Sequence, residues 1–143
     1  MKKQNQTGQP PVSEKRFEMG FRIFNRWLSL RQNNKTLLPF FRDNRIGTVA
    51  IYGMGALGER LYQELKDSGI FVEYAIDRLA SSKERLGFSV YGSEEKSFPQ
   101  TDAVVITPVQ DYWAIVEELE TKTDAALVSL EDVVDYCADG EDV

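Results

Sequence analysis

The sequence of 143 residues contains no histidine and a single cysteine, Cys137. Without histidine, the chain on its own cannot form a Ser-His-Asp triad, a Cys-His pair or a Cys₂His₂ zinc site. With one cysteine it cannot form an internal disulfide bond. Acidic residues near Cys137 disfavour its thiolate, so we expect a structural thiol. Any chemistry of this chain therefore proceeds without imidazole, and we expect no metal site.

Long hydrophobic runs are also missing. The longest apolar stretches, such as 49–52 and 103–106, fall far short of the ~18–20 residues that span a bilayer. The first twelve residues are rich in Gln, Asn and Lys and lack the apolar centre of a secretory signal. We expect a soluble, cytoplasmic chain with a disordered segment at 1–12 and an acidic tail at 138–143.

Positive charge is scarce after residue 45. Residues 1–45 carry ten Lys and Arg against three acids, a net charge of +7, whereas residues 46–143 carry a net charge of −13. The acidic part argues against nucleic-acid binding. The basic residues of the first part are interleaved with apolar ones, which favours docking on the acidic body or on a second copy.

Residues 13–45 have the pattern of a helical extension. Apolar residues recur at spacings of three and four over 13–32, which predicts an amphipathic helix, and a short second helix follows. The aromatic stripe of the first helix consists of Phe17, Phe21, Phe24 and Trp27. We expect this stripe to cover one face of the body, in the same chain or in a second copy. A homodimer built partly on this helix is the corresponding hypothesis.

Residues 46–137 alternate between short apolar runs and helical patterns. The expected strands cover 49–52, 70–76, 88–91, 102–107 and 125–130, and the expected helices cover 56–66, 109–122 and 131–137. Such alternation implies a parallel sheet with right-handed crossovers. We predict an α/β fold with one parallel five-stranded sheet in the order 3-2-1-4-5 and helices on both faces, preceded by the helical extension. Trp113 is expected in the core.

One segment carries a chemical motif, the G-x-G-x-x-G of residues 53–58. It follows an expected strand, opens an expected helix, and precedes a second strand that ends at an acid. That acid, Asp77, lies 19 residues past the last glycine, close to the ~20-residue interval of dinucleotide-binding units. The residues of the motif are Gly53, Met54, Gly55, Ala56, Leu57 and Gly58.

Each part of this motif has a mechanical reason. Gly53 permits the tight turn out of the strand, Gly55 lets a pyrophosphate approach the backbone, and Gly58 lets the helix pack closely on the sheet. The helix N-terminus supplies N–H groups and partial positive charge for the phosphates. Asp77 is placed to accept hydrogen bonds from ribose hydroxyls, which favours NAD over a 2′-phosphorylated cofactor. The alternative is that the glycines only form a tight connection between strand and helix.

Three further residues belong to the predicted site. Arg78 can stack on an adenine, pair with a 2′-phosphate, or be an ordinary surface arginine. Thr107 and Pro108 stand at the end of the fourth strand, where ligands of open α/β sheets bind, and can contact a ribose or a nicotinamide. Pro108 can equally do no more than open the next helix.

No residue is assigned a catalytic role. Tyr62 and Lys66 match the tyrosine–lysine spacing of short-chain dehydrogenases. Their place on the first helix after the glycine loop directs them away from the strand ends, so we reject that role. No other acid–base residue stands out in the sequence.

Several segments between residues 45 and 134 resemble NAD(P)-binding Rossmann modules of bacterial surface-glycan biosynthesis. They are I-Y-G-M-G-A-L-G, A-I-D-R, G-F-S-V-Y-G-S-E-E and D-A-V-V-I-T-P. The stretch is similar to the nucleotide-binding half of nucleotide-sugar dehydratases and dehydrogenases, and to the N-terminal domain of sugar acyltransferases. The resemblance implies a Rossmann-like fold that binds a dinucleotide or a nucleotide-sugar and depends on a second domain for catalysis. We expect no substrate lid from residues 131–143, which are too few to form one.

These observations lead to three hypotheses about function. The favoured one is a module that binds NAD(H), with NADP or a nucleotide-sugar as other ligands, and serves partner enzymes of glycan assembly as an accessory or sensor. The second is an oxidoreductase subunit whose active site is completed by a dimer or a partner domain. The third is an interaction module whose nucleotide site is vestigial.

Overall fold

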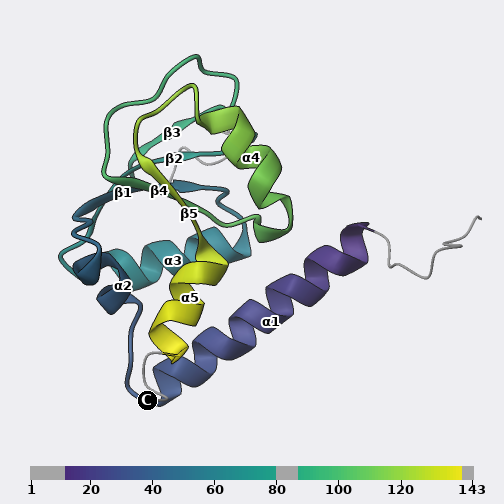
Figure 1. Cartoon of the computed structure of the whole chain (residues 1–143), viewed down its shortest axis with the longest axis vertical. Coiled ribbons are helices and arrows are strands. Elements are labelled where there is room, and N and C mark those ends of the chain that lie inside the picture. The colour runs from purple at the N-terminus through teal and green to yellow at the C-terminus, as the bar shows by residue number, and fades with distance from the viewer. Residues whose placement is uncertain (1–11, 80–86, 140–143) are drawn as a thin grey trace, which may run out of the picture.

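A computed structural model describes residues 12–79 and 87–139 of the chain (Figure 1). The expected disordered start and acidic tail fall mostly on residues 1–11 and 140–143, which lie outside the described residues. Of those two segments, Val12, Ala138 and Asp139 are described and are helical.

The centre of the molecule is a parallel sheet of five strands in the order β3-β2-β1-β4-β5. The strands are β1 (Thr48–Tyr52), β2 (Phe71–Ile76), β3 (Ser89–Tyr91), β4 (Ala103–Ile106) and β5 (Ala126–Ser129). The predicted α/β fold and strand order are confirmed. The central strand β1 and its neighbour β4 are the most continuously buried, because helices or loops cover both of their faces.

The register of the sheet brings three strand ends to one edge. Tyr52, the last residue of β1, pairs with Ile76 of β2 on one side and with Ile106 of β4 on the other. Each of these residues ends its strand, so the three connections that follow begin side by side. Gly53, Asp77 and Thr107 are the first residues of those connections.

Within residues 12–79 and 87–139, five α-helices surround the sheet on both of its faces. They are α1 (Val12–Gln32), α2 (Leu38–Asp43), α3 (Ala56–Leu65), α4 (Tyr112–Leu119) and α5 (Leu130–Asp139), and a 3₁₀ helix, η2 (Val109–Asp111), precedes α4. One face packs against α3, α5 and the extension formed by α1 and α2, while α4 and the loop around Phe98 cover the other (Figure 1).

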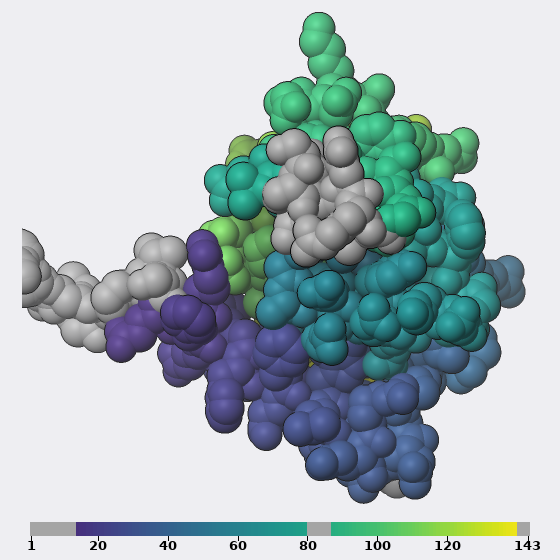
Figure 2. Space-filling view, turned by 180° about the vertical axis from the view of Figure 1, so that it is seen from behind, coloured from purple at the N-terminus to yellow at the C-terminus, as the bar shows by residue number. Residues whose placement is uncertain are grey.

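The extension covers the sheet face within the same chain, but only with part of its aromatic stripe. Trp27 is buried in the core together with Ile23, and Phe24 is half-buried. Phe17 and Phe21 are instead 77% and 72% exposed. Figure 2 shows the first half of α1, in purple, projecting from the side of the body.

The segment 109–122 differs from the expected single helix. It forms η2 and then a short α4, and Trp113 is 78% exposed, so the prediction that Trp113 lies in the core is wrong. Ile115 and Leu119, one helical turn apart, are the buried residues of α4. Trp113 precedes Ile115 by two positions, about 200° around a helix, and therefore faces solvent. The other expected elements end within one or two residues of the observed bounds.

Candidate functional site

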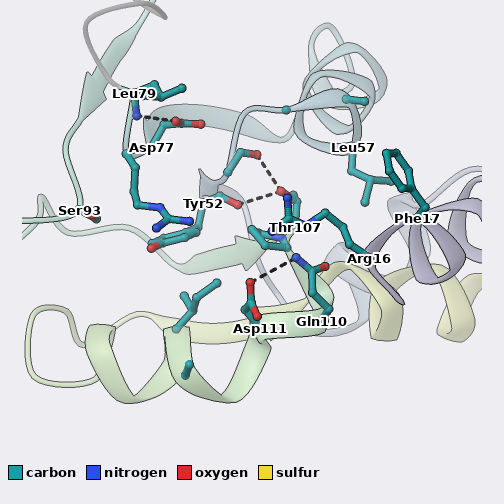
Figure 3. A pocket seen from close by; sticks show the side chains of 18 of the residues that line it. Arg16, Phe17, Tyr52, Leu57, Asp77, Leu79, Ser93, Thr107, Gln110 and Asp111 are labelled. Carbon is teal, nitrogen blue, oxygen red and sulfur yellow. Dashed lines mark hydrogen bonds between the residues drawn. The ribbon is translucent and has the colours of Figure 1, made fainter. Parts of the chain in front are cut away.

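A pocket of about 790 Å³ lies at the edge where β1, β2 and β4 end. The glycine loop and the start of α3 form one wall, and η2 and α4 form another. The connection after β2 closes one end of the pocket, and the first half of α1 closes the other (Figure 3). This is the edge at which ligands bind in open α/β sheets.

The structure requires glycine at position 53. Its φ angle is +92°, a region that L side chains rarely adopt. A Cβ added here would lie 2.6 Å from Oγ1 of Thr107 and 2.8 Å from Cδ of Pro108. The loop therefore turns out of β1 directly against the residues that follow β4.

The other two glycines of the motif have opposite surroundings. A Cβ at Gly58 would lie 2.0 Å from the carbonyl oxygen of Gly53, so α3 packs on the loop as closely as the motif predicts. A Cβ at Gly55 would meet nothing within 4 Å. Gly55 thus lies in the pocket wall beside open space.

The N-terminus of α3 opens on the same space. Gly55 is its N-cap and has no side chain to accept a hydrogen bond from the first turn. The first bond of the helix runs from the N–H of Glu59 to the carbonyl of Gly55. Ala56 and Leu57, whose N–H groups belong to that first turn, line the pocket. Uncapped N–H groups and the helix dipole favour an anion at this position.

Asp77 holds the backbone of two loops. Its Oδ2 accepts a hydrogen bond from the N–H of Met54 at 2.7 Å, and its Oδ1 accepts one from the N–H of Leu79 at 2.8 Å. The sequence predicts a contact with ribose hydroxyls and does not reveal this loop-fixing role. An ionised carboxylate has about four acceptor sites, so Asp77 retains capacity for a ribose hydroxyl.

Thr107 fixes the glycine loop from the side of β4. Its side chain is buried, and its hydroxyl lies 2.7 Å from the carbonyl oxygen of Gly53 and 3.0 Å from that of Tyr52. The hydroxyl proton is therefore used within the protein, and only its lone pairs can face a ligand. Pro108 is the N-cap of η2 and not its first residue, and its ring packs toward Gly53.

Beside Asp77, the pocket contains a tyrosine–carboxylate pair. The hydroxyl of Tyr52 donates to Oε1 of Glu118 at 3.1 Å. Burial and the Glu118 carboxylate raise the pKa of Tyr52 to about 12, and the nearby charge of Arg78 opposes that shift. Tyr52 is therefore a neutral phenol at physiological pH. Glu118 lies three residues after buried Ile115, so helical spacing places it on the sheet side of α4, and this signal is present in the sequence.

The pocket also includes part of α1, which the sequence did not predict. The α1 residues that line the pocket are Arg16, Phe17, Gly20, Phe21 and Phe24. Their spacing by itself predicts only a surface for packing. A glycine within an aromatic stripe was the available signal, because packing seldom selects glycine in a helix interior.

Two residues set aside in the sequence lie away from the pocket. Tyr62 packs on Phe88, with ring centroids 5.1 Å apart, and does not line the pocket. Cys137 is buried in α5, and burial raises the pKa of its thiol. Neither is placed to act on a ligand at the strand ends.

Comparisons with protein-family models, curated proteins and solved structures gave no match for this chain. The fold is Rossmann-like, whereas the expected link to glycan assembly stays a prediction. Across residues 12–79 and 87–139, no helix is long and apolar enough to cross a membrane. The same part of the chain brings together no group of three or more potential metal-ligating side chains.

Proposed function

We propose that this chain binds a dinucleotide, NAD(H) in the first place, with its pyrophosphate at the glycine loop. The observation that carries the proposal is the pocket of about 790 Å³ into which Gly55 and the uncapped start of α3 open. The volume falls in the upper part of the ~300–1,000 Å³ range of small-molecule sites. Phosphate oxygens fit the free N–H groups and the dipole of the helix.

The preference for NAD over NADP rests on Asp77. Its carboxylate is held between two backbone N–H groups at the end of β2, on the side expected for the ribose of the adenosine. A fixed negative charge at that place repels a 2′-phosphate. Arg78 is exposed beside Asp77, and its positive charge partly offsets the rise in the pKa of Tyr52.

The proposed role is binding or sensing in support of a partner, not a complete reaction. The chain has no histidine, and Tyr52 stays protonated at neutral pH because its pKa is about 12. Neither an imidazole nor a Tyr52 phenolate is therefore available as a general base near neutral pH. The proposed module presents or senses its nucleotide for a second protein.

Calorimetric titration with NAD⁺, NADH, NADP⁺ and a panel of UDP- and CDP-sugars tests the proposal. We expect micromolar binding of NAD⁺ or NADH that the Gly55→Asp variant loses, because its carboxylate faces the phosphates. Gln63→Glu is the matched control, since it adds the same charge at an exposed position of the same helix, outside the pocket. Binding of a nucleotide-sugar alone would change the ligand class, and no binding across the panel would refute the proposal.

A further inference from the structure

The pocket extends well beyond the glycine loop, and its far end is formed by one face of α1. We call this face the α1 wall and define it as Arg16, Phe17, Gly20, Phe21 and Phe24. These residues recur at spacings of three and four, so they share one side of the helix. The α1 wall lies across the pocket from Asp77 and Ser93, with the glycine loop and Thr107 between them (Figure 3).

Gly20 lies in the middle of the α1 wall without a packing reason. Glycine weakens a helix interior relative to alanine. A Cβ at this position would meet nothing within 4 Å, so no neighbouring group demands its absence. The same holds for Gly55 in the glycine loop. Two glycines from different elements thus leave open space in the lining of one cavity.

Phe24 gives the α1 wall a fixed aromatic surface. Its ring is stacked on that of Trp27, with centroids 6.5 Å apart and planes 12° from parallel. Trp27 is itself buried, and its indole N–H donates to Oε1 of Glu64 at 2.9 Å. The orientation of Phe24 is therefore set by the core, whereas Phe17 and Phe21 are largely exposed at the rim.

The α1 wall also carries positive charge. Arg16 is exposed, and its side chain is directed from α1 into the pocket on the side of Thr107 (Figure 3). No described residue forms an ion pair with Arg16. A cation at this place can meet a phosphate bound at the start of α3.

We infer that the α1 wall holds the distal half of a dinucleotide, so that α1 selects a dinucleotide over a mononucleotide. This inference rests on the proposed function and adds the part of the ligand that lies beyond the pyrophosphate. The planar ring of the second nucleoside packs against the aromatic face over Gly20, and Arg16 faces the second phosphate. Aromatic faces suit a flat heterocycle, and the cavity runs without interruption from the glycine loop to this face.

Calorimetric titration of the full chain with ADP and NAD⁺ separates the two halves of the site. Gly20→Leu fills the open space without breaking the helix, and we expect it to weaken NAD⁺ binding about tenfold or more while ADP binding stays within about twofold. Phe21→Ser, at a position that is 72% exposed, should leave the fold intact and is expected to weaken the binding of NAD⁺ alone by about three- to tenfold. Leu28→Ser is the matched control, because Leu28 is 58% exposed on α1 and does not line the pocket.

The outcomes separate this inference from the proposed function. Equal effects on ADP and NAD⁺, or none, would overturn the role of α1 and leave the glycine-loop site in place. Absence of binding of either ligand to the unmodified chain would overturn both. A second copy of the chain is the competing occupant of the exposed aromatic residues. Light scattering that shows a dimer lost in Phe21→Ser, with nucleotide affinities unchanged, would also overturn the inference.

Discussion

The indole N–H of Trp27 donates a hydrogen bond to Oε1 of Glu64, at 2.9 Å. The other oxygen of the same carboxylate accepts the backbone N–H of Leu37 at 2.7 Å and lies 3.5 Å from Nη1 of Arg31. The Glu64 side chain is only 7% exposed. One carboxylate on α3 therefore anchors both helices of the N-terminal extension to the helix that begins at the glycine loop.

Removing this carboxylate is expected to destabilise the protein. Glu64→Ala leaves two buried N–H donors unpaired, and we expect it to lower the free energy of unfolding by about 2–4 kcal/mol. Glu64→Gln retains one acceptor and is expected to cost less. Urea denaturation gives both values, with Gln63→Ala on the exposed side of the same helix as the control. A Glu64→Ala loss no larger than that of the control would contradict the anchoring role.

The glycines of the loop are expected to differ sharply in their tolerance of alanine. Gly58→Ala places a methyl group 2.0 Å from a backbone oxygen, which cannot move aside, and should cost at least about 2–3 kcal/mol of unfolding free energy. Gly55→Ala enters open space at an ordinary φ of −80° and should cost less than about 1 kcal/mol. Denaturant titration of the two variants tests this order, and similar losses would refute it.

The phenols of Tyr52 and Tyr74 are expected to ionise late. Burial is the main cause that raises the pKa of each to about 12, from an ordinary value of 10.0. Because the folded pKa lies above the unfolded one, the stability linked to these groups is complete below pH 10 and is lost as the pH rises toward 12. Phenolate absorbance against pH should lose one late-titrating group in Tyr52→Phe and one in Tyr74→Phe. If the group that disappears in either variant titrates near pH 10, the assignment is contradicted.

Asp102 is expected to make stability sensitive to acid. Its Oδ2 accepts the N–H groups of Gly47 and Thr48, at 2.9 and 3.1 Å, and these bonds lower the pKa of the carboxyl below 3.8. The stabilisation is therefore present above pH 3.8 and is lost as the pH falls through the lower folded pKa. Asp102→Asn should melt below the unmodified protein at neutral pH, and the gap should close in acid. Asp124→Asn, at an exposed position, is the control, and a gap independent of pH would refute the account.

The sheet and the glycine loop were predictable because their signals are local. Buried apolar runs such as 103–106 identify central strands, and the motif spacing places Asp77 at the neighbouring strand end. The roles of Gly53 and Gly58 follow from chain geometry that any sequence with this motif must satisfy.

The remaining features depend on tertiary contacts that a single sequence does not encode locally. The exposure of Trp113 follows from the packing of Ile115 and Leu119 in the core, which turns the opposite side of α4 to solvent. The hydrogen bond from the N–H of Met54 to Asp77 depends on how closely the two loops approach in the folded chain. The place of α1 beside the pocket follows from its contacts with α5 and η2, which lie more than 75 residues later in the sequence.

The anchoring of α1 has a mechanical consequence. Its second half is buried through Ile23, Trp27 and Leu30, whereas Phe17 and Phe21 on its first half are 77% and 72% exposed. The helix is thus anchored to the body mainly through its C-terminal half. Amide hydrogen exchange should therefore slow progressively from the N-terminal half of α1 toward its C-terminal half. Most of the α1 wall belongs to this exposed half, so the proposed ligand would have to restrict the motion of the helix when it binds. The stiffness of α1 would then contribute to the affinity of the proposed site.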